Sequence, residues 1–410
     1  MIEGFTKTAS RIALVAAAGL LVGAAMTPAK AADLGGGCCA DLEERVAELE
    51  ATTARKGNRV VSLQVYGQVN KALMIWDDGI DSDTFVVDNT LASSRLGFAG
   101  TAKINSVLSA GYNMEFELVD ARADMVYNGA GGDDPEDSSG LHLRKNFWYL
   151  EHARLGRISV GQQSTAGDGA TEVVLSNSMR NADSNIGANL RIRDSSGGYN
   201  APLNTTLWSP GYNQWASDFT ADSIDDVIRY DSPSIYGFIV SASWGDDDFA
   251  DVALRFKREF TNFRVAAAIT YQWDDRDGGD FDSEVLAGSI SAKHLPTGLY
   301  AAFAAGEREY EGKDIEDESF WYVQAGIEKN WLSYGATTLY GEYGKYNGFY
   351  QPNVAENDSE ATRWGVGLNQ KINSAAMDVY AHATFWSFED NTNTDYEDLT
   401  TVVIGSRIQF

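Results

Sequence analysis

The chain has 410 residues, of which 44% are hydrophobic, and it carries a formal net charge of -27. The apolar content is too high for a disordered chain, and the acidic balance argues against a nucleic-acid partner, because phosphate backbones are bound mainly by clustered Lys and Arg. The 2 cysteines, Cys38 and Cys39, are adjacent and match no zinc, thioredoxin-like or haem spacing, so no redox centre or cofactor is expected.

Residues 1–31 have the pattern of a secretory signal peptide, with a basic start, an apolar Ala-rich stretch over 12–26 and a small-x-small cleavage site at 29–31. The apolar stretch is shorter than the roughly 20 residues of a spanning helix, which disfavours the alternative of a membrane anchor. We predict that the mature chain begins at Ala32 and is exported.

Residues 32–59 are predicted to be an N-terminal periplasmic segment that contains a short helix over 38–56. The helical repeat positions alternate between spacings of four and three: Leu42, Val46, Leu49 and Thr53. Isolated helices of this length are marginal. Two alternatives therefore stay open, a frayed amphipathic peptide and a three-helix stalk on a trimer axis, in which Cys38 and Cys39 would cross-link neighbours in the oxidising periplasm.

From Val60 onward the sequence repeats segments of about ten residues in which apolar and polar side chains alternate, separated by turns rich in Gly, Asp and Asn. Val265 and Ile269, for example, are out of phase with Arg264 and Thr270. A period of two predicts strands with one apolar and one polar face. The sixteen segments are 60–76, 91–103, 106–120, 142–151, 155–163, 225–232, 236–245, 250–260, 262–273, 284–293, 298–308, 319–329, 333–345, 361–371, 375–387 and 399–410.

Two folds satisfy this pattern, a soluble sandwich with apolar faces inward and a transmembrane barrel with apolar faces outward. The apolar faces mix Ala and Gly with large residues, and Trp residues gather near strand ends as in interfacial girdles. The girdle candidates are Trp76, Trp148, Trp244, Trp273, Trp321, Trp331 and Trp386. The polar faces are rich in guanidinium, including Arg95, Arg157, Arg229, Arg255, Arg264, Arg363 and Arg407. We predict an all-β fold, a 16-stranded antiparallel transmembrane β-barrel over 60–410, which is wide enough to enclose an aqueous channel.

Short turns alternate with long acidic loops, and one connection, 164–224, is much longer than the others. A surface lid is one alternative. We prefer a loop folded into the lumen, where its mixed charges meet the basic polar faces. Its acidic residues are Asp168, Glu172, Asp183, Asp194, Asp218 and Asp222. Acidic clusters in the other loops, such as 246–248, offer oxygen ligands to Ca²⁺ but lack a complete loop motif, and we expect solvated loops that are able to bridge through divalent ions to lipopolysaccharide.

No phosphate loop, dinucleotide fingerprint, His-Glu-x-x-His motif or Gly-x-Ser-x-Gly elbow occurs. The 4 histidines are scattered and are expected to be lumen or turn residues: His142, His152, His294 and His382. We expect no enzymatic activity. An outer-membrane hydrolase stays as an alternative, because spacing along the chain does not exclude a Ser or Asp beside a His on a barrel wall.

The sequence resembles the outer-membrane general porins of the alphaproteobacterial type over essentially all of the mature chain. The resemblance rests on Gly-Gly-Cys-Cys-Ala-Asp-Leu-Glu-Glu-Arg-Val-Ala-Glu-Leu-Glu at 36–50, on Ile-Arg-Tyr-Asp-Ser-Pro at 228–233 followed by Gly-Phe at 237–238, and on the terminal Ile-Gln-Phe. Phe410 matches the family's signal for membrane insertion.

This resemblance implies a homotrimer in the outer membrane, each barrel being a water-filled pore for passive diffusion of small hydrophilic solutes and ions, with loop 164–224 in the place of an inward constriction loop. By strand position it implies a basic wall opposite that loop: Arg95, Arg144, Arg157, Arg229 and Arg255. The overall acidity favours cations at the mouth and the basic wall opposes that preference inside, so we predict a weakly cation-selective channel.

Two observations leave alternatives open. A sugar-type specific channel would need an aromatic slide along the lumen, yet the alternation places only Tyr66, Tyr322 and Tyr380 on the inward phase. Lys71 falls on the outward, apolar phase of the first strand, where a bulge, a rim position or burial between protomers would each explain it.

Overall fold

A computed structural model describes the part of the chain that follows the predicted N-terminal segment. The described residues are 60–128, 140–180, 182, 190, 192–197, 224–245, 249–274, 282–310, 317–347, 360–391 and 394–410. The chain divides into two units, Met1–Gly57 and Asn58–Phe410, and the described residues all belong to the second. The predicted signal peptide 1–31, the segment 32–59 with its helix 38–56, and the loop 246–248 lie outside them.

The described residues are almost entirely β-structure. The strands are β1 (Gln64–Asp77), β2 (Ser82–Asp88), β3 (Arg95–Lys103), β4 (Leu108–Val119), β5 (Gly140–His152), β6 (Gly156–Ser164), β7 (Ile224–Asp231), β8 (Phe238–Gly245), β9 (Phe249–Glu259), β10 (Phe263–Asp274), β11 (Ser283–His294), β12 (Leu299–Tyr310), β13 (Glu318–Leu332), β14 (Gly335–Asn347), β15 (Glu360–Ile372), β16 (Met377–Glu389) and β17 (Leu399–Gln409). Three short 3-10 turns accompany them, η2 (Thr90–Ala92), η3 (Ala123–Met125) and η5 (Asn373–Ala375). Among the described residues, no helix has the length and apolar character needed to cross a membrane.

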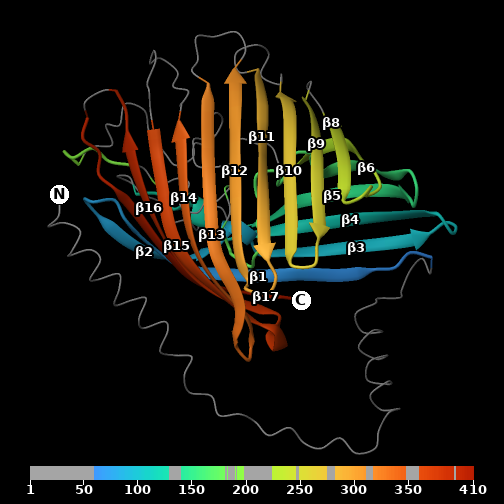
Figure 1. Ribbon diagram of the computed structural model, residues 1–410, viewed down its shortest axis with the longest axis horizontal. Coiled ribbons are helices and arrows are strands. Elements are labelled where there is room, and N and C mark those ends of the chain that lie inside the picture. Colours follow the sequence, from blue (N-terminus) through green and yellow to red (C-terminus); the bar gives the residue numbers. More distant parts are fainter. Residues whose placement is uncertain are drawn as a thin grey trace, which may run out of the picture. The chain divides into compact units, whose positions relative to one another are not determined.

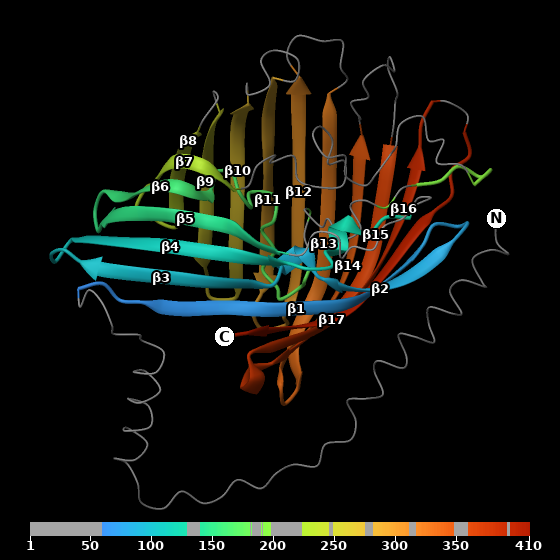
Figure 2. The same ribbon diagram turned by 180° about the vertical axis from the view of Figure 1, so that it is seen from behind.

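The strands form one closed antiparallel barrel. From β3 to β17 each strand pairs with the next, and β1 pairs with β17 on one side and with β3 on the other. The two ribbon views show β10–β14 on one wall and β3–β5 on the opposite one (Figures 1 and 2). This confirms the predicted 16-stranded barrel.

The sequence pattern did not predict β2. Residues 64–68 of β1 pair with β3, whereas residues 71–77 of the same strand pair with β2. The segments β2 and β3 are therefore two successive parts of one barrel strand, interrupted at 89–94. Counted this way, the 17 strands make sixteen positions around the barrel.

The apolar faces of the strands point outward. Ile290, Phe303 and Val366 are 50%, 47% and 53% exposed, whereas Ser289 and Arg363, on the alternate phase, are 8% and 0% exposed. A soluble sandwich would show the reverse, because it hides its apolar faces. A belt of exposed large apolar side chains around a closed barrel is what the hydrocarbon of a bilayer requires.

Two tryptophans do not belong to the predicted interfacial girdles. Five of the seven candidates are exposed on the outer surface: Trp148, Trp244, Trp273, Trp321 and Trp331. Trp76 and Trp386 instead lie on the inward phase of β1 and β16 and are only 5% and 2% exposed. The girdle assignment was wrong for these two, because it used position along the strand and ignored the phase of the alternation.

The described part of the long loop lies inside the barrel. The amide groups of Ala166 and Gly167 donate to the carboxylate of Asp251 on β9, at 3.2 and 2.6 Å. Farther along, Val173 and Leu175 donate backbone hydrogen bonds of 3.1 and 3.0 Å to the hydroxyls of Ser289 and Ser291 on β11. The described part of the loop thus runs across the inner wall, which favours the inward-folded loop over the surface lid.

The loop continues to the far side of the barrel. Asn177 donates from its amide to Glu328 on β13 (2.7 Å) and from its side chain to Asp378 on β16 (2.9 Å). A hydrophobic core then forms between the loop and the inner faces of β1 and β13–β17. Its large members include Met74, Trp76, Met179, Leu190, Ile192, Phe320, Tyr322, Tyr346, Tyr380, Trp386 and Phe388.

Candidate functional site

Six cations point inward from one continuous wall formed by β3 to β9. They are Arg95 on β3, Arg144 and Lys145 on β5, Arg157 on β6, Arg229 on β7 and Arg255 on β9. Beyond Asp168, the described part of the loop packs against the opposite wall, so this basic wall keeps its side chains toward the remaining interior.

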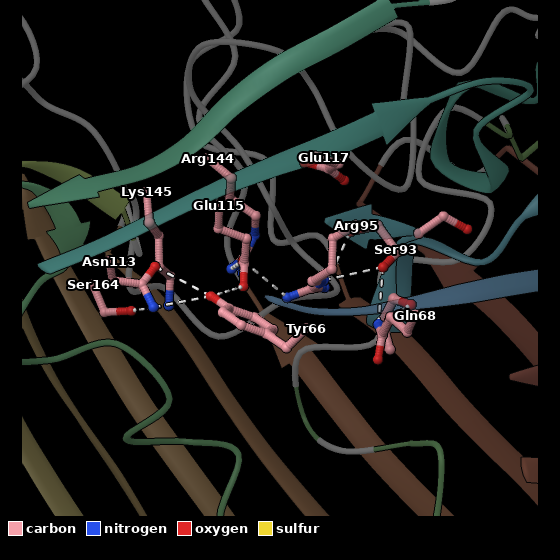
Figure 3. A network of polar contacts seen from close by, with 12 residues as sticks. Tyr66, Gln68, Ser93, Arg95, Asn113, Glu115, Glu117, Arg144, Lys145 and Ser164 are labelled. Atoms are coloured by element: carbon pink, nitrogen blue, oxygen red, sulfur yellow. Dashed lines mark hydrogen bonds and ion pairs between the residues drawn. The ribbon is translucent and has the colours of Figure 1, made fainter. Parts of the chain in front are cut away.

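Glu115 on β4 organises the first part of the basic wall. Its Oε1 lies 2.6 Å from Arg144 Nη1 and 3.5 Å from Arg95 Nη1, and its Oε2 accepts a hydrogen bond of 3.0 Å from the hydroxyl of Tyr66. Figure 3 shows Glu115 between the two guanidinium groups, with the ring of Tyr66 beside it. Asn113 also bonds the Tyr66 hydroxyl. This carboxylate is therefore fully engaged with its neighbours.

A β-bulge explains why Arg144 and Lys145 both face inward although they are consecutive. Glu115 of β4 pairs with Lys145, but the next residue, Phe116, pairs with Leu143, so Arg144 is the extra residue. A bulge of this kind re-aims a side chain that regular alternation would turn outward. The local irregularity thus doubles the charge that β5 contributes to the wall.

A cavity of about 240 Å³ opens on this wall. It is lined by Tyr66, Asn113, Glu115, Lys145, Phe147, Arg157, Ser159, Gln163, Ser164, Arg229 and Asp231. Lys145 Nζ donates to the Ser164 hydroxyl at 3.1 Å, where the long loop begins. Arg229 also holds this root, because its Nη1 donates to the carbonyls of Ser164 and Thr165 at 3.0 and 2.8 Å.

The other two cations of the wall have few partners. Arg157 stacks on the ring of Tyr149, with 3.6 Å between Cζ and the ring centroid, and its buried Nε has no hydrogen-bond partner. Arg255 donates from Nη2 to the carbonyl of Asp168 at 2.6 Å, while its buried Nη1 has no partner.

Three of the arginines predicted to line the pore lie apart from this cluster. Arg264 is near the short turn before β10, where it pairs with Glu259 at 2.5 Å with both side chains largely in solvent. Arg407 bonds Asp378 at 2.8 Å on the neighbouring wall, from where its charge still acts on Arg95. Arg363 is 0% exposed, so its prediction as a pore-lining residue was wrong: the loop and its core cover it completely.

The predicted acidic residues of the loop are only partly within the described chain. Asp183, Asp218 and Asp222 lie outside it. Asp168 is close enough to Lys145 and Arg255 to interact with both electrostatically. Glu172 directly precedes the segment bound to β11.

Asp194 lies elsewhere, bridging to Tyr396 before β17 and accepting a hydrogen bond of 2.6 Å from the Ser196 hydroxyl. Of the described acidic residues, Asp168 is the one that the structure brings to the basic wall.

Phe410, the predicted insertion signal, lies at the seam where the barrel closes. Its backbone exchanges hydrogen bonds of 3.0 and 2.9 Å with Gly67 on β1, and its side chain is 65% exposed. The terminal aromatic ring is thus presented on the outer surface, in the neighbourhood of Ile408.

A family model described as Gram-negative porin matches residues 13–391 of the chain. The chain belongs to the Gram-negative porin family. Among solved structures, the fold is similar to the anion-selective porin from Comamonas acidovorans (TM-score 0.57, 16% identity, 85% of this chain and 100% of that chain). It is also similar to OmpF of Salmonella typhi in complex with daunomycin (TM-score 0.53, 18% identity, 87% of this chain and 99% of that chain). A loop deletion mutant of OmpT of Vibrio cholerae has a similar fold as well (TM-score 0.57, 15% identity, 86% of this chain and 100% of that chain). None of the curated protein sequences compared with the chain is similar enough to count as a relative.

Family membership and fold together confirm the resemblance to the porins. This porin is an outer-membrane channel for the passive diffusion of small hydrophilic solutes. The solved structures share low sequence identity with it, so they support the fold, while the family model carries the assignment.

The sequence interpretation missed Lys145, Glu115 and Tyr66 as members of one site of this porin. Lys145 was missed because regular alternation allows only one of two consecutive residues to face inward. Two adjacent basic residues in an otherwise alternating strand are the signal that could have indicated a bulge.

The porin also has more inward aromatic side chains than the alternation indicated, but they do not form an exposed slide. Five inward tyrosines each lie across from a glycine of the next strand: Tyr66 and Gly97, Tyr149 and Gly111, Tyr300 and Gly326, Tyr340 and Gly367, Tyr380 and Gly405. A Cβ atom added at these glycines would lie within 2.2 to 2.8 Å of the tyrosine ring. The rings therefore cover the neighbouring strand, a packing seen as aromatic rescue of glycine in sheets.

Proposed function

We propose that this porin is a non-enzymatic homotrimer in which each barrel carries a constriction, formed by the loop 164–224 facing the basic wall. The observation that carries the proposal is the attachment of the loop. Its root is bound by Arg229 and Lys145 on the basic wall, and its next residues cross to the opposite wall. This course narrows the lumen and leaves the remaining passage on the basic side.

In this proposal the passage is a positively charged throat. Arg95, Arg144, Lys145, Arg157 and Arg229 act on a passing solute together, because opposed or clustered charges in a narrow low-dielectric channel are poorly screened. We therefore expect anions to be favoured inside the throat, which opposes the cation preference that the overall acidity predicts at the mouth. The fold that this chain shares with an anion-selective porin is compatible with such a throat.

Lys71 supports the trimer. It lies on the outward phase of β1 between Val69 and Leu73, and pairs with Asp88 at 3.5 Å and Asp120 at 3.0 Å. A cation in a lipid-facing belt is costly, so charged residues there are usually covered by protein. A second copy of this chain is the covering partner we propose, and the OmpT structure of Vibrio cholerae recorded in trimer form offers a precedent with a similar fold.

Turn geometry supports the absence of catalysis. His152 Nδ1 accepts backbone hydrogen bonds of 3.2 Å from Arg154 and Leu155, and His294 bonds Thr297 in the next short turn. His382 is buried inside the wall of β16. Each of these three histidines lies in a turn or inside the barrel wall.

We retain four further parts of the proposal on the grounds of sequence. Residues 1–31 are a cleaved signal peptide, 32–59 form a periplasmic segment, Phe410 directs membrane insertion, and the acidic outer loops bridge to lipopolysaccharide through Ca²⁺ or similar ions.

Single-channel recording of the purified protein in a planar lipid bilayer tests the proposal. We expect stepwise conductance increments in groups of three that rise with salt concentration, and no hydrolysis of ester or peptide substrates by the same preparation. Single, ungrouped increments would contradict the trimer. A saturable block by maltose, with little effect of charged solutes, would instead favour a sugar-type channel.

A further inference from the structure

We propose that the cavity on the basic wall is a binding station for a small oxyanion, one that presents at least two acceptor oxygens, such as a dicarboxylate or a phosphate. The inference rests on the proposed function, because the station lies along the proposed passage. It goes beyond that function by assigning a place, a set of donors and a class of preferred solute.

The lining of the cavity carries an excess of positive charge. Three cations line the cavity, Lys145, Arg157 and Arg229, against two carboxylates, Glu115 and Asp231, which leaves an excess of one positive charge (three minus two). Arg255 adds to it from β9, since its charge acts on the same region as that of Arg229. The positive charges of the wall are therefore concentrated around this one cavity.

Both carboxylates of the lining already have partners in the wall. Glu115 is shared by Arg144, Arg95 and the Tyr66 hydroxyl. Asp231 accepts from Arg229 at 2.8 Å and from the Ser241 hydroxyl at 2.6 Å. The excess positive charge therefore resides on Lys145 and Arg157, for which the lining provides no free carboxylate.

Lys145 and Arg157 bring hydrogen-bond donors to the cavity that lack acceptors. Within the described chain Lys145 forms no ion pair, and its one hydrogen bond, to Ser164, leaves donor capacity on the ammonium. The buried Nε of Arg157 has no acceptor. The rest of the Arg157 guanidinium lines the cavity and forms no hydrogen bond within the described chain, so an oxyanion there finds free donors on both side chains.

The geometry favours a planar, two-pronged ligand. Stacking on Tyr149 fixes the plane of the Arg157 guanidinium, and a fixed guanidinium recognises carboxylate or phosphate through two parallel hydrogen bonds. Lys145 approaches from the neighbouring strand β5 as a point charge. A ligand with two acceptor oxygens can bond the guanidinium and reach the ammonium, which chloride cannot do.

The cavity size limits the ligand. Its volume of about 240 Å³ is below the range of roughly 300–1,000 Å³ of pockets for drug-sized molecules. Asp168 acts on Lys145 and Arg255 at longer range and competes with an entering anion. We therefore expect weak, rapidly reversible binding that concentrates the solute in the throat without stopping its passage.

The test combines conduction with a binding measurement that does not need conduction. Inorganic phosphate and succinate are titrated against the chloride current through the trimer in a planar bilayer, with maltose as the neutral control. In parallel, the ³¹P line width of phosphate is measured with the detergent-solubilised porin.

The variants are Lys145→Gln and Arg157→Gln, and the matched control is Arg264→Gln, which removes one positive charge at the exposed rim pair with Glu259. We expect millimolar phosphate or succinate to reduce the wild-type current, and each site variant to raise the half-blocking concentration by about tenfold, the effect of one lost charge-assisted hydrogen bond. Arg264→Gln should leave the block unchanged. If Arg157→Gln does not fold, Arg157→Lys is used in its place. This change keeps the positive charge but removes the two parallel N–H donors of the guanidinium, so it should still weaken the block.

Each outcome decides the inference. Equal block in the wild type and the site variants, or equal block by maltose, overturns the station. A conducting wild type without block or line broadening also overturns it and leaves the proposed channel intact. Broadening that Lys145→Gln abolishes in a protein without conductance supports the station and contradicts the channel. Block by only one of the two probes supports the station and identifies its preferred oxyanion.

Discussion

Arg180 of the inward loop and Glu342 of β14 form an ion pair of 2.8 Å in which each side chain is only 1% exposed. Glu342 also accepts a hydrogen bond of 2.8 Å from the Tyr322 hydroxyl and lies 3.7 Å from Arg363. Arg363 in turn is surrounded by the rings of Tyr322, Tyr346 and Trp386. One buried carboxylate thus holds the loop to the wall and faces two buried guanidinium groups.

Replacing Glu342 by Gln should loosen the loop. The change removes the carboxylate that pairs with Arg180 and faces Arg363, and breaking a buried pair typically costs about 3–5 kcal/mol. The thermal unfolding temperature in detergent should therefore be lower than that of the wild type, and the single-channel current should become noisier. The matched control is Glu360→Gln, since the Lys345 and Glu360 pair is 33% and 27% exposed and such pairs contribute about 0–1 kcal/mol. Equal effects of the two changes would contradict the anchoring role.

The hydroxyls of Ser289 and Ser291 should control the mobility of the middle of the loop. Each accepts a backbone hydrogen bond from the loop, from Val173 and Leu175 respectively. A hydrogen bond of this kind contributes about 1 kcal/mol, so amide exchange at 173 and 175 should become roughly fivefold faster in the Ser289→Ala, Ser291→Ala double variant. Ser319→Ala, whose hydroxyl accepts from Asn347, is the control. Unchanged exchange in the double variant would mean that the loop is held by other contacts.

The absence of a side chain at Gly97 should be essential for the arrangement of the basic wall, because the ring of Tyr66 packs on this glycine. A Cβ atom there would lie 2.2 Å from Cζ of Tyr66, which must then leave Glu115. Gly97→Ala should therefore lower the unfolding temperature and change the reversal potential in a salt gradient, with a stability cost of about 1–3 kcal/mol for such overpacking. At Gly341 the nearest atom to an added Cβ is 3.8 Å away, so Gly341→Ala is the neutral control. A wild-type reversal potential in Gly97→Ala would separate Tyr66 from selectivity.

Lys71 should be needed for assembly more than for folding of one barrel. Its partner Asp88 is 1% exposed, and Lys71→Ala leaves that carboxylate without an ion pair at the proposed protomer contact. We expect the trimer to dissociate at a lower temperature on unheated gels while the monomer keeps its β-sheet circular dichroism. Lys345→Ala, on an exposed pair, should leave the trimer intact. A trimer of unchanged stability in Lys71→Ala would remove this support for the interface.

The alternation of side chains predicted the barrel well because lipid outside and water inside impose opposite demands on successive residues. The same rule could not find β2, because the barrel strand that contains it is broken at 89–94, where Asn89, Ser93 and Ser94 turn inward and are buried. Nor could it predict Lys145, whose inward direction depends on the bulge with β4.

The least predictable part of the candidate site was the course of the loop. The sequence indicated acidic loop residues facing a basic wall. The structure shows the described loop bound largely through its amides and Arg180 to acidic and hydroxyl groups, first to Asp251 on β9 and then to Glu328 and Glu342 on the far wall. Backbone donors carry no signature in the residue pattern, so contacts of this kind become visible only once the chain is folded.

The most direct test of the whole account is the current through single channels carrying one accessible cysteine, in a background with Cys38→Ser and Cys39→Ser. A bulky, negatively charged, water-soluble thiol reagent is added to Lys145→Cys and, separately, to Val366→Cys, which is 53% exposed on the outer face of β15 in the wild type. Our account predicts a stepwise fall in conductance for Lys145→Cys and no change for Val366→Cys. Block at Val366→Cys with an unaffected Lys145→Cys would contradict the account, because it would place the aqueous path on the wrong side of the barrel wall.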